Sequence, residues 1–251
     1  MTKLNGKIRF VYLIIIAHVF YQIFADEPEA IVGGTAAAPR EFPHQCSLRY
    51  RGSHICGCSI IGSTKILTAA HCTDDLSPSS LRVATGTLSI TGGEIHEVKT
   101  IVEHPQYSRR VQEAWKNDIA VITLKSPINF NENQKPIALA TSRPKAGEQC
   151  TLSGWGQIST NGPPSRVLLK MTQQILPQND CQNQHRTMPL TGSHLCAINR
   201  YGIGVCSGDS GGPLISNGVQ IGLTSWGLPC AQGKPDVYTD VAYHLDFIKR
   251  S

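Results

Sequence analysis

Three short segments of the sequence contain the residue types needed for nucleophilic catalysis. They are Thr68-Ala69-Ala70-His71-Cys72, Asn117-Asp118-Ile119-Ala120 and Gly208-Asp209-Ser210-Gly211-Gly212-Pro213. A serine hydroxyl is a weak nucleophile at neutral pH and needs a base within hydrogen-bonding distance. A histidine suits that task because its pKa lies near neutrality, and a buried carboxylate can orient its ring. Glycines around Ser210 would let the backbone turn tightly, so that the N–H groups of Gly208 and Ser210 could bind one oxyanion.

Each of these residues alone has an ordinary structural explanation. A single histidine is usually a hydrogen-bonded polar residue, and an aspartate beside an apolar strand usually caps a turn. The three segments in the order His, Asp, Ser argue against coincidence, because that order belongs to one of the known arrangements of a catalytic triad. No pair of histidines and cysteines has the spacing of a zinc site, so we expect no metal.

The N-terminus has the pattern of a secretory signal peptide. Lys3, Lys7 and Arg9 precede a mostly apolar run from Phe10 to Phe24, which is followed by Ala25. This run of 15 residues is shorter than the roughly 20 apolar residues of a membrane-spanning helix. We therefore expect residues 1–25 to direct secretion to the extracellular space, and no later segment is apolar enough to span a bilayer.

Composition bounds the remaining possibilities. The 251 residues allow one large or two small domains, and 16% charged with 40% apolar residues excludes a disordered tail and a membrane bundle. The net charge of +5 is not the dense basic stripe of a nucleic-acid binder. Nine cysteines indicate an oxidising compartment, and the odd number leaves at least one without an internal partner.

Short strands should form most of the structure. Lys65–Thr68, Ile119–Leu124, Leu168–Ile175 and Val219–Ser225 are rich in apolar and β-branched residues, and Gly, Pro, Asn and Ser separate such stretches. Helical periodicity occurs only at the end, where Val241, Leu245 and Ile248 share one face with Phe247 beside them. The pattern predicts an all-β barrel or sandwich with one C-terminal helix. The polar stretch 129–135 is the best boundary between two halves.

With these motifs the sequence resembles the secreted serine endopeptidases of the trypsin–chymotrypsin family. The resemblance runs through Ile31-Val32-Gly33-Gly34, Ser153-Gly154-Trp155-Gly156 and Ser225-Trp226-Gly227, and Pro235-Asp236-Val237-Tyr238-Thr239 is most similar to insect chymotrypsins. It implies His71 as general base, Asp118 as its orienting partner and Ser210 as nucleophile, with Gly208 and Ser210 as the oxyanion hole. Some relatives have lost catalysis and act as binding proteins, usually through loss of a triad residue, and all three are present here.

The same resemblance implies the architecture and the partners. It predicts two six-stranded antiparallel β-barrels with a C-terminal α-helix and the active site between them. The expected parts are a signal peptide (1–25), an activation propeptide (26–30), the first barrel (31–134), and the second barrel with the helix (135–251). We expect protein or peptide substrates, protein protease inhibitors and an activating peptidase as partners of a monomer, with no cofactor, nucleic acid or membrane.

Activation in such enzymes follows a cleavage that frees the amino group of Ile31. The resulting ammonium would pair with Asp209 and order the oxyanion hole. Relatives usually carry Arg or Lys before the cut, whereas this chain has Ala30 preceded by Asp26-Glu27-Pro28-Glu29. A trypsin-like activator should therefore not cut here. Stepwise removal of X-Pro and X-Ala dipeptides and cleavage by an Ala-preferring endopeptidase both remain open.

Substrate specificity is expected to depend on the primary pocket. Trypsin-like relatives carry an Asp six residues before the catalytic serine, where this chain has Gly204, followed by Val205. Gly227 leaves the pocket open, and Ser225, Trp226 and Gly227 would pair with the substrate backbone. The resemblance thus implies cleavage after large apolar or aromatic residues. Asp236, on the opposite wall, could instead accept a Lys, or pair with Tyr238 or water and shorten the pocket for Leu or Met, so elastase-like and mixed aromatic/Lys specificity remain alternatives.

The cysteines divide into two groups. By resemblance, Cys56 pairs with Cys72, Cys181 with Cys196 and Cys206 with Cys230, and Cys150 lacks its usual partner. Cys46 and Cys58 flank a hairpin that we expect to turn at Arg51-Gly52-Ser53, with Gly52 at its centre. In that register Tyr50 faces His54, Leu48 faces Cys56 and Cys46 faces Cys58, close to disulfide distance. An extra Cys46–Cys58 disulfide follows; two buried thiols, or a Cys46–Cys150 pair, are the alternatives.

Overall fold

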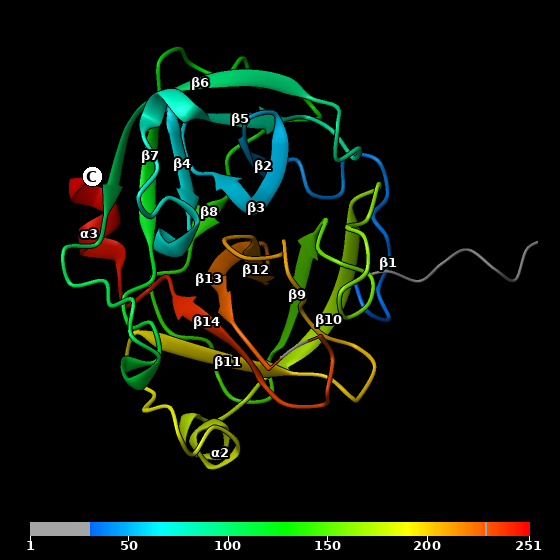
Figure 1. The fold of residues 1–251 in the computed structure, drawn as a ribbon, viewed down its shortest axis with the longest axis vertical. Coiled ribbons are helices and arrows are strands. Elements are labelled where there is room, and N and C mark those ends of the chain that lie inside the picture. The colour runs from blue at the N-terminus through cyan, green and yellow to red at the C-terminus, as the bar shows by residue number, and fades with distance from the viewer. Residues whose placement is uncertain (1–30, 229) are drawn as a thin grey trace, which may run out of the picture.

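The computed structural model describes residues 31–228 and 230–251, so the expected signal peptide and activation segment lie outside the described residues. The chain forms mostly short strands, and two groups of six strands each close into an antiparallel barrel (Figure 1). The fold class expected from the sequence is confirmed. Within the described ranges, no helix has the length and apolar character needed to cross a membrane.

The first barrel closes because its first strand pairs with two others. Its strands are β2 (Gln45–Tyr50), β3 (Ser53–Ile60), β4 (Lys65–Thr68), β5 (Leu81–Thr85), β6 (Glu94–Glu103) and β7 (Ala120–Leu124). They join in the order β2-β3-β4-β7-β6-β5, and β2 pairs with β5 to complete the ring. Buried aliphatic side chains, among them Leu48, Ile66 and Ile122, fill the interior. Burying these chains supplies the main driving force for the barrel.

The second barrel follows the same principle. Its strands are β9 (Gln149–Gly154), β10 (Leu169–Ile175), β11 (His194–Ile198), β12 (Pro213–Ser216), β13 (Val219–Trp226) and β14 (Asp236–Asp240). The ring β10-β11-β14-β13-β12-β9 closes through the β9–β10 pairing. Two short strands lie outside the ring: β1 (Thr35–Ala36) pairs with β10, and β8 (Ala138–Leu139) runs parallel to β13. The core includes Ile31, so the start of the described chain belongs to this barrel.

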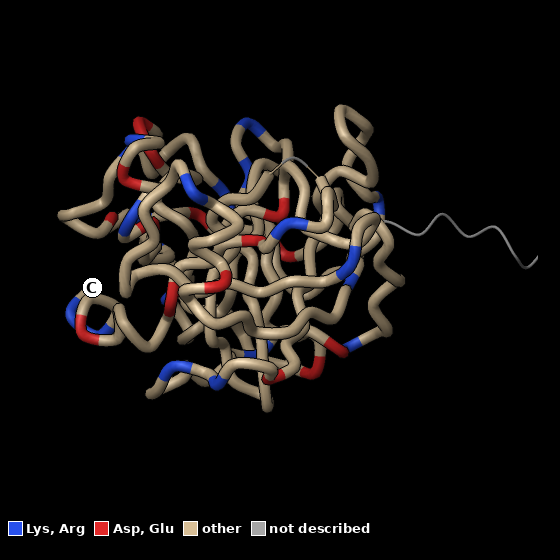
Figure 2. The backbone as a smooth tube through the Cα atoms, turned by 90° about the horizontal axis from the view of Figure 1, so that it is seen from below, with Lys and Arg blue, Asp and Glu red and all other residues tan. Residues whose placement is uncertain are grey.

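Two short α-helices complete the fold of the described residues. Helix α2 (Gln178–Gln184) precedes β11, and the C-terminal helix α3 (Leu245–Arg250) packs Phe247 and Ile248 against the first barrel near β4 and β7 (Figure 1). The helix is shorter than its periodicity predicts, because Val241 lies buried in the turn before it. Basic residues are spread over several parts of the backbone rather than gathered in one stripe (Figure 2).

The β2–β3 hairpin corrects one detail of the sequence analysis. The chain turns through Arg51 and Gly52, both with positive φ (51° and 85°), so Tyr50 pairs with Ser53 and the predicted Tyr50–His54 pair is wrong. A register shift then restores the expected Cys46–Cys58 pair, and a disulfide joins these cysteines with their Cα atoms 4.9 Å apart. The turn matches a two-residue hairpin loop, whose central residues both need positive φ.

The remaining cysteines follow the expected pattern. Disulfides join Cys56 to Cys72, Cys181 to Cys196, and Cys206 to Cys230. Cys150 is a buried free thiol, and its burial raises its pKa to about 12. A thiol that stays protonated at neutral pH is unreactive, so Cys150 acts as a small core residue.

Candidate active site

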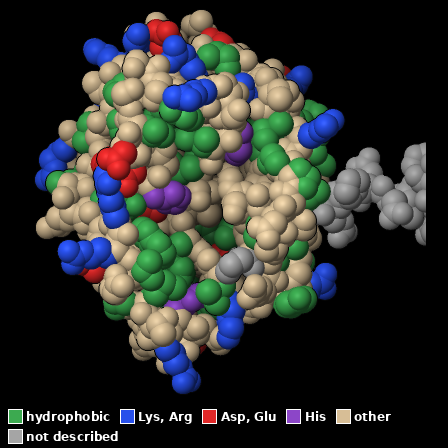
Figure 3. Space-filling view, viewed as in Figure 1, with side chains coloured by type: hydrophobic (Ala, Val, Ile, Leu, Met, Phe, Trp, Pro, Cys, Tyr) green, Lys and Arg blue, Asp and Glu red, His purple; other side chains and the backbone are tan. Residues whose placement is uncertain are grey.

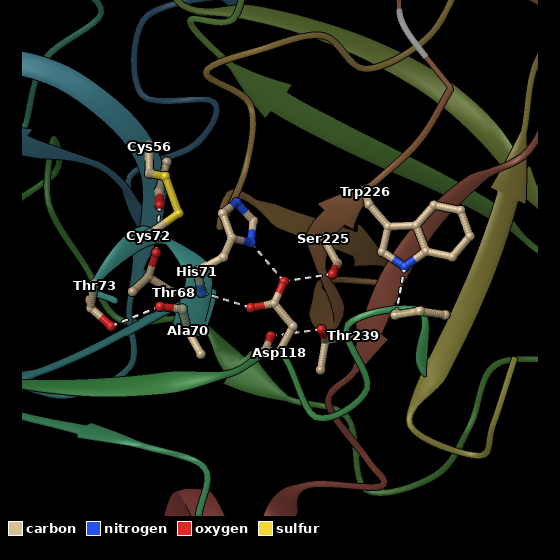
Figure 4. Close-up of polar contacts among 12 residues, drawn as sticks. Cys56, Thr68, Ala70, His71, Cys72, Thr73, Asp118, Ser225, Trp226 and Thr239 are labelled. Carbon is tan, nitrogen blue, oxygen red and sulfur yellow. Dashed lines mark hydrogen bonds and ion pairs between the residues drawn. A yellow bond between two sulfur atoms is a disulfide. The ribbon is translucent and has the colours of Figure 1, made fainter. Parts of the chain in front are cut away.

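His71 and Asp118 lie close together because the end of β4 is next to the start of β7. His71 lies in the 3₁₀ turn η1 (Ala70–Cys72) just after β4, and Asp118 lies just before β7, which pairs with β4 in antiparallel register. The Asp118 Oδ2 atom is 2.7 Å from His71 Nδ1, and its Oδ1 atom accepts the His71 backbone N–H at 2.9 Å (Figure 4). The carboxylate thus keeps a proton on Nδ1 and leaves Nε2 free to act as a base.

Both barrels hold Asp118. The residue is 1% exposed, and Ser225 Oγ of β13 donates to its Oδ2 atom at 2.6 Å. Thr239 Oγ1 of β14 donates to its backbone carbonyl at 2.7 Å (Figure 4). Hydrogen bonds to a charged group are stronger than those between neutral groups. Asp118 precedes a strand of the first barrel, and hydrogen bonds from the second barrel fix it at the interface between the two.

Opposing effects set the basicity of His71. Burial lowers the pKa of His71, but the charge and hydrogen bond of Asp118 and the charge of nearby Asp74 together raise it above its usual value. The imidazole is neutral, and so able to accept a proton, only above that raised pKa.

Close backbone packing brings the Ser210 loop to β3 and to the end of β4, which precedes the turn that carries His71. The Ser210 carbonyl accepts the N–H of Gly57 in β3 at 2.8 Å, and Gly211 donates to Thr224 at 2.7 Å. A side chain at Gly211 would overlap the Thr68 hydroxyl at the end of β4, so this approach requires glycine. The structure contains no hydrogen bond between the Ser210 hydroxyl and the described His71 side chain. Such bonds often tighten only when substrate binds.

Two backbone donors beside Ser210 are unoccupied. The N–H groups of Asp209, Gly211 and Gly212 all donate to carbonyls, whereas those of Gly208 and Ser210 have no hydrogen-bond partner within residues 31–228 and 230–251. Gly208 has a φ of 98°, and its carbonyl accepts a hydrogen bond from His54 Nε2 at 3.0 Å. An oxyanion hole requires paired N–H groups of this kind beside the hydroxyl that attacks the substrate.

Asp209 is a buried carboxylate without a cationic partner among the described residues. Its oxygens accept the N–H groups of Gly156 and Cys206 at 2.8 and 3.0 Å, and burial raises its pKa to about 6. Side chains at Gly154 or Gly156 would overlap this carboxylate, which explains the Gly-Trp-Gly sequence. Ile31 is fully buried, and Val32 forms a β-bridge with Gly204.

A second buried carboxylate lies between the two glycines assigned to the primary pocket. A Cβ atom at Gly204 would lie 3.4 Å from Asp236 Oδ2, and one at Gly227 would lie 2.9 Å from Oδ1. The Oδ2 atom accepts the Gln173 side-chain amide at 2.6 Å and the Val205 N–H at 3.2 Å. Burial raises the pKa of Asp236 to about 7. The expected primary pocket would therefore have at its wall a carboxyl group whose pKa lies close to neutral pH.

Known proteins are similar to this chain over most of its length. The trypsin family model matches residues 31–248. This chain belongs to the trypsin family. It is 38% identical to chymotrypsin-2 of Vespa crabro, over 88% of the chain and 99% of that protein, and 41% identical to trypsin alpha of Drosophila erecta, over 84% and 83%. Mouse neuropsin, described as a serine protease, superimposes with a TM-score of 0.80 at 32% identity, covering 86% of this chain and 97% of neuropsin.

The family establishes a serine endopeptidase, a hydrolase acting on proteins or peptides. It does not establish which bonds this trypsin-family chain cleaves, because relatives named chymotrypsin and trypsin match it about equally well. Substrate specificity must therefore be inferred from the residues of the expected primary pocket.

The sequence analysis missed Gln173, the partner of Asp236. Gln173 donates to Asp236 and accepts the Tyr238 hydroxyl, so Tyr238 reaches the carboxylate only through this amide. Gln173 is buried between Met171 and Ile175 on alternate positions of β10. A polar residue at an inward position of a strand was the available signal, because a buried amide needs partners.

One cluster of potential metal ligands falls at this site but cannot bind as such. The sulfur atoms of Cys56 and Cys72 lie within 4.8 Å of a His71 ring nitrogen. Both sulfurs belong to one disulfide, and a metal ligand must be a thiolate. The disulfide instead braces the turn that carries His71.

Proposed function

We propose that this trypsin-family chain is a secreted endopeptidase that cleaves peptide bonds through an acyl-enzyme on Ser210. The Ser210 oxygen attacks the carbonyl carbon while His71 Nε2 takes its proton, and the Gly208 and Ser210 N–H groups bind the oxyanion. Protonated His71 then gives the proton to the leaving amine, and water repeats the sequence to release the acid. The pairing of a bonded His71–Asp118 couple with two unoccupied N–H groups carries this proposal.

Active-site labelling tests the mechanism. After removal of residues 1–30, phenylmethanesulfonyl fluoride should modify Ser210 alone and abolish peptide hydrolysis, and Ser210→Ala should block both. A catalytically silent binding protein would show neither labelling nor hydrolysis, and that result would overturn the proposal.

For specificity we favour large apolar or aromatic residues before the scissile bond. Gly204 places no charge at the position where trypsin-like relatives carry Asp, and Gly227 adds no side chain to the wall. Ser225 lies at a register shift between β13 and β14, so it has no partner in β14, and Ser225 to Gly227 would pair with the substrate backbone as an added strand.

Asp236 supports a second candidate, mixed aromatic and Lys specificity. Its Oδ1 atom accepts no hydrogen bond from the described residues, so it could meet a Lys ammonium. The same carboxyl also shortens the pocket, which would favour Leu. Values of kcat/KM for peptides with Phe, Leu, Ala, Lys or Arg before the scissile bond decide among these options. Arg best by about tenfold would contradict our interpretation of the pocket.

Export and activation complete the proposal. Residues 1–25 would be removed on secretion and residues 26–30 on activation, which frees Ile31 to pair with Asp209. Incubating the proform with a dipeptidyl peptidase and sequencing its N-terminus tests one route. Persistence of Glu27 or Glu29 would exclude it and favour an Ala-preferring endopeptidase. Protein inhibitors and a monomeric state are part of the same expectation.

A further inference from the structure

One backbone carbonyl near the cleft accepts two hydrogen bonds from the second barrel. The Ala114 carbonyl accepts Trp226 Nε1–H of β13 at 2.9 Å and lies 2.8 Å from His194 Nε2 at the start of β11. Ala114 is fully buried and has a φ of 50°, and Trp115 and Asn117 also have positive φ values of 49° and 58°. Such conformations persist only where the surroundings impose them. The two side chains therefore hold this loop in place.

The hydrogen bonds of His194 define its protonation state. The Thr191 backbone N–H donates to His194 Nδ1 at 2.9 Å, so Nδ1 carries a lone pair. The remaining ring proton must then lie on Nε2, which donates to the Ala114 carbonyl. His194 is 2% exposed, so water does not replace either contact. The arrangement requires a neutral imidazole.

This loop links the cleft wall to the proposed triad. The Trp115 ring lies 6.1 Å from the Trp226 ring, and both are partly exposed. Trp226 belongs to the segment that we propose pairs with substrate residues before the scissile bond. In the space-filling view of Figure 3, hydrophobic side chains gather on the face of the molecule that Figure 1 shows. Further along the loop, the Asn117 N–H donates to Ser193 Oγ at 3.4 Å, immediately before Asp118.

We propose that His194 is a positioning residue for substrate specificity: through the Ala114 carbonyl it fixes Trp115 against Trp226 and so shapes the site for substrate residues before the one at the scissile bond. The inference rests on the proposed function, because that function assigns the Trp226 segment to substrate. His194 itself touches no reacting atom.

The same geometry makes this contact sensitive to pH. A proton added at Nδ1 would point at the Thr191 N–H and break that hydrogen bond. The charged or titratable groups around His194 are Asp118, Arg143 and His244: Asp118 favours protonation, and Arg143, whose guanidinium donates to the His194 carbonyl, opposes it. Burial is the largest effect and lowers the pKa of His194. The contact should hold at neutral pH and weaken in acid.

Two variants at one position test the proposal. His194→Gln places an amide N–H near Nε2 without a titrating group, whereas His194→Leu removes the donor. For a tetrapeptide amide, His194→Leu should lower kcat/KM about tenfold, mainly through KM, while a single-residue ester should change less than about twofold. His194→Gln should restore the peptide value to within about threefold. The peptide-to-ester ratio should fall in acid for the parent enzyme and not for His194→Gln, since His71 affects both substrates alike.

Tryptophan fluorescence gives a readout that does not need hydrolysis. The parent should show an acid transition that His194→Gln lacks, and the Ser210→Ala background keeps the chain intact. Equal loss on peptide and ester, or no loss on either, in a folded His194→Leu variant would overturn the proposal. If His194→Leu does not fold, the fluorescence comparison still decides: an acid transition that is the same in the parent and in His194→Gln would overturn the proposal. If the parent enzyme hydrolyses only the single-residue ester, or neither substrate, the proposed function itself is wrong.

Discussion

At the scale of single residues, the charge next to His71, the proposed general base, affects the pH at which its ring loses a proton. Asp118 is fixed by the triad geometry, but Asp74 is a separate neighbour, two residues beyond Cys72, whose negative charge also raises the pKa of His71. Arg109 pairs with both Asp74 and the adjacent Asp75, so it partly offsets that charge. The pKa of the proposed base therefore depends on residues outside the proposed triad as well.

Asp74→Asn should shift the acidic limb of the kcat/KM profile downward by about half a pH unit, the scale of one nearby charge in a partly solvated site. Removing a negative charge destabilises the imidazolium, so His71 loses its proton at lower pH. Asp75→Asn is the matched control, because its side chain is 82% exposed and it does not influence the pKa of His71. Equal shifts in the two variants would contradict this assignment.

Asp236 should reduce stability as pH rises, because its carboxyl must ionise in a buried site. Its folded-state pKa of about 7 lies well above the unfolded value. Its neutral form therefore favours folding at low pH, and that contribution is lost progressively as the pH rises from the unfolded pKa of about 4 to the folded pKa of about 7. Relative to its parent, Asp236→Asn should gain on the order of 3 kcal/mol in unfolding free energy between pH 4 and 8.

Chemical denaturation of the uncut Ser210→Ala chain measures this gain without self-digestion. The comparison of variant with parent cancels the contribution of other groups, including the buried histidines. Glu132→Gln removes an exposed carboxyl that pairs with Arg40 and should show no comparable trend. A difference that stays flat with pH would mean that Asp236 is already ionised in the folded chain.

At the scale of elements, the β2–β3 hairpin carries one disulfide within it and is joined by a second to the turn that holds His71. Cys46–Cys58 joins the two strands of the hairpin. Cys56, which also lies in β3, forms a disulfide with Cys72 beside His71. Gly57 of this strand also donates to Ser210. The hairpin therefore contacts both the turn that holds the proposed base and the loop that holds the proposed nucleophile.

Replacing Cys46 and Cys58 together by Ala should lower the unfolding free energy by about 3 kcal/mol, the chain-entropy value for a loop of this length. The rest of the fold supplies the register of the hairpin, so activity per folded molecule should change little. Cys150→Ala, which removes a buried thiol without a crosslink, is the control and should cost less. Calorimetry of the three proteins makes the comparison; equal losses would contradict a stabilising role for the disulfide.

The hairpin also shows what sequence could and could not predict. The Cys46–Cys58 pairing followed from strand geometry, yet the tip of the hairpin was wrong by one residue because a bulge, invisible in the pattern, absorbs the difference. The local pattern predicted an all-β barrel or sandwich, and the family resemblance supplied the two barrels and the motif residues, which stand in short recognisable segments. Contacts such as Gln173–Asp236 and His194–Ala114 join residues 63 and 80 positions apart. Only the closed barrels bring them together.

At the scale of the whole molecule, the second barrel has the features that the proposed activation at Ile31 would use. Ile31 is already buried, and Val32 already bridges to Gly204 at the pocket. Asp209, with its pKa raised to about 6 by burial, lacks a cation among the described residues. A new ammonium at Ile31 would remove the cost of that buried charge and stabilise the loop that carries Gly208 and Ser210.

Ala30→Arg should therefore create a chain that trypsin can switch on. Trypsin should leave the parent proform inactive, because Ala30 offers no basic residue, and should activate the variant by exposing Ile31, as N-terminal sequencing would verify. Pairing with Asp209 raises the pKa of the new amino group above its usual value of about 8. Activity should then persist at pH 8 and decline as the pH rises further and the ammonium is lost. Adding Asp209→Asn should leave the cut chain inactive. Full activity in that double variant would mean that the loop orders without the ion pair.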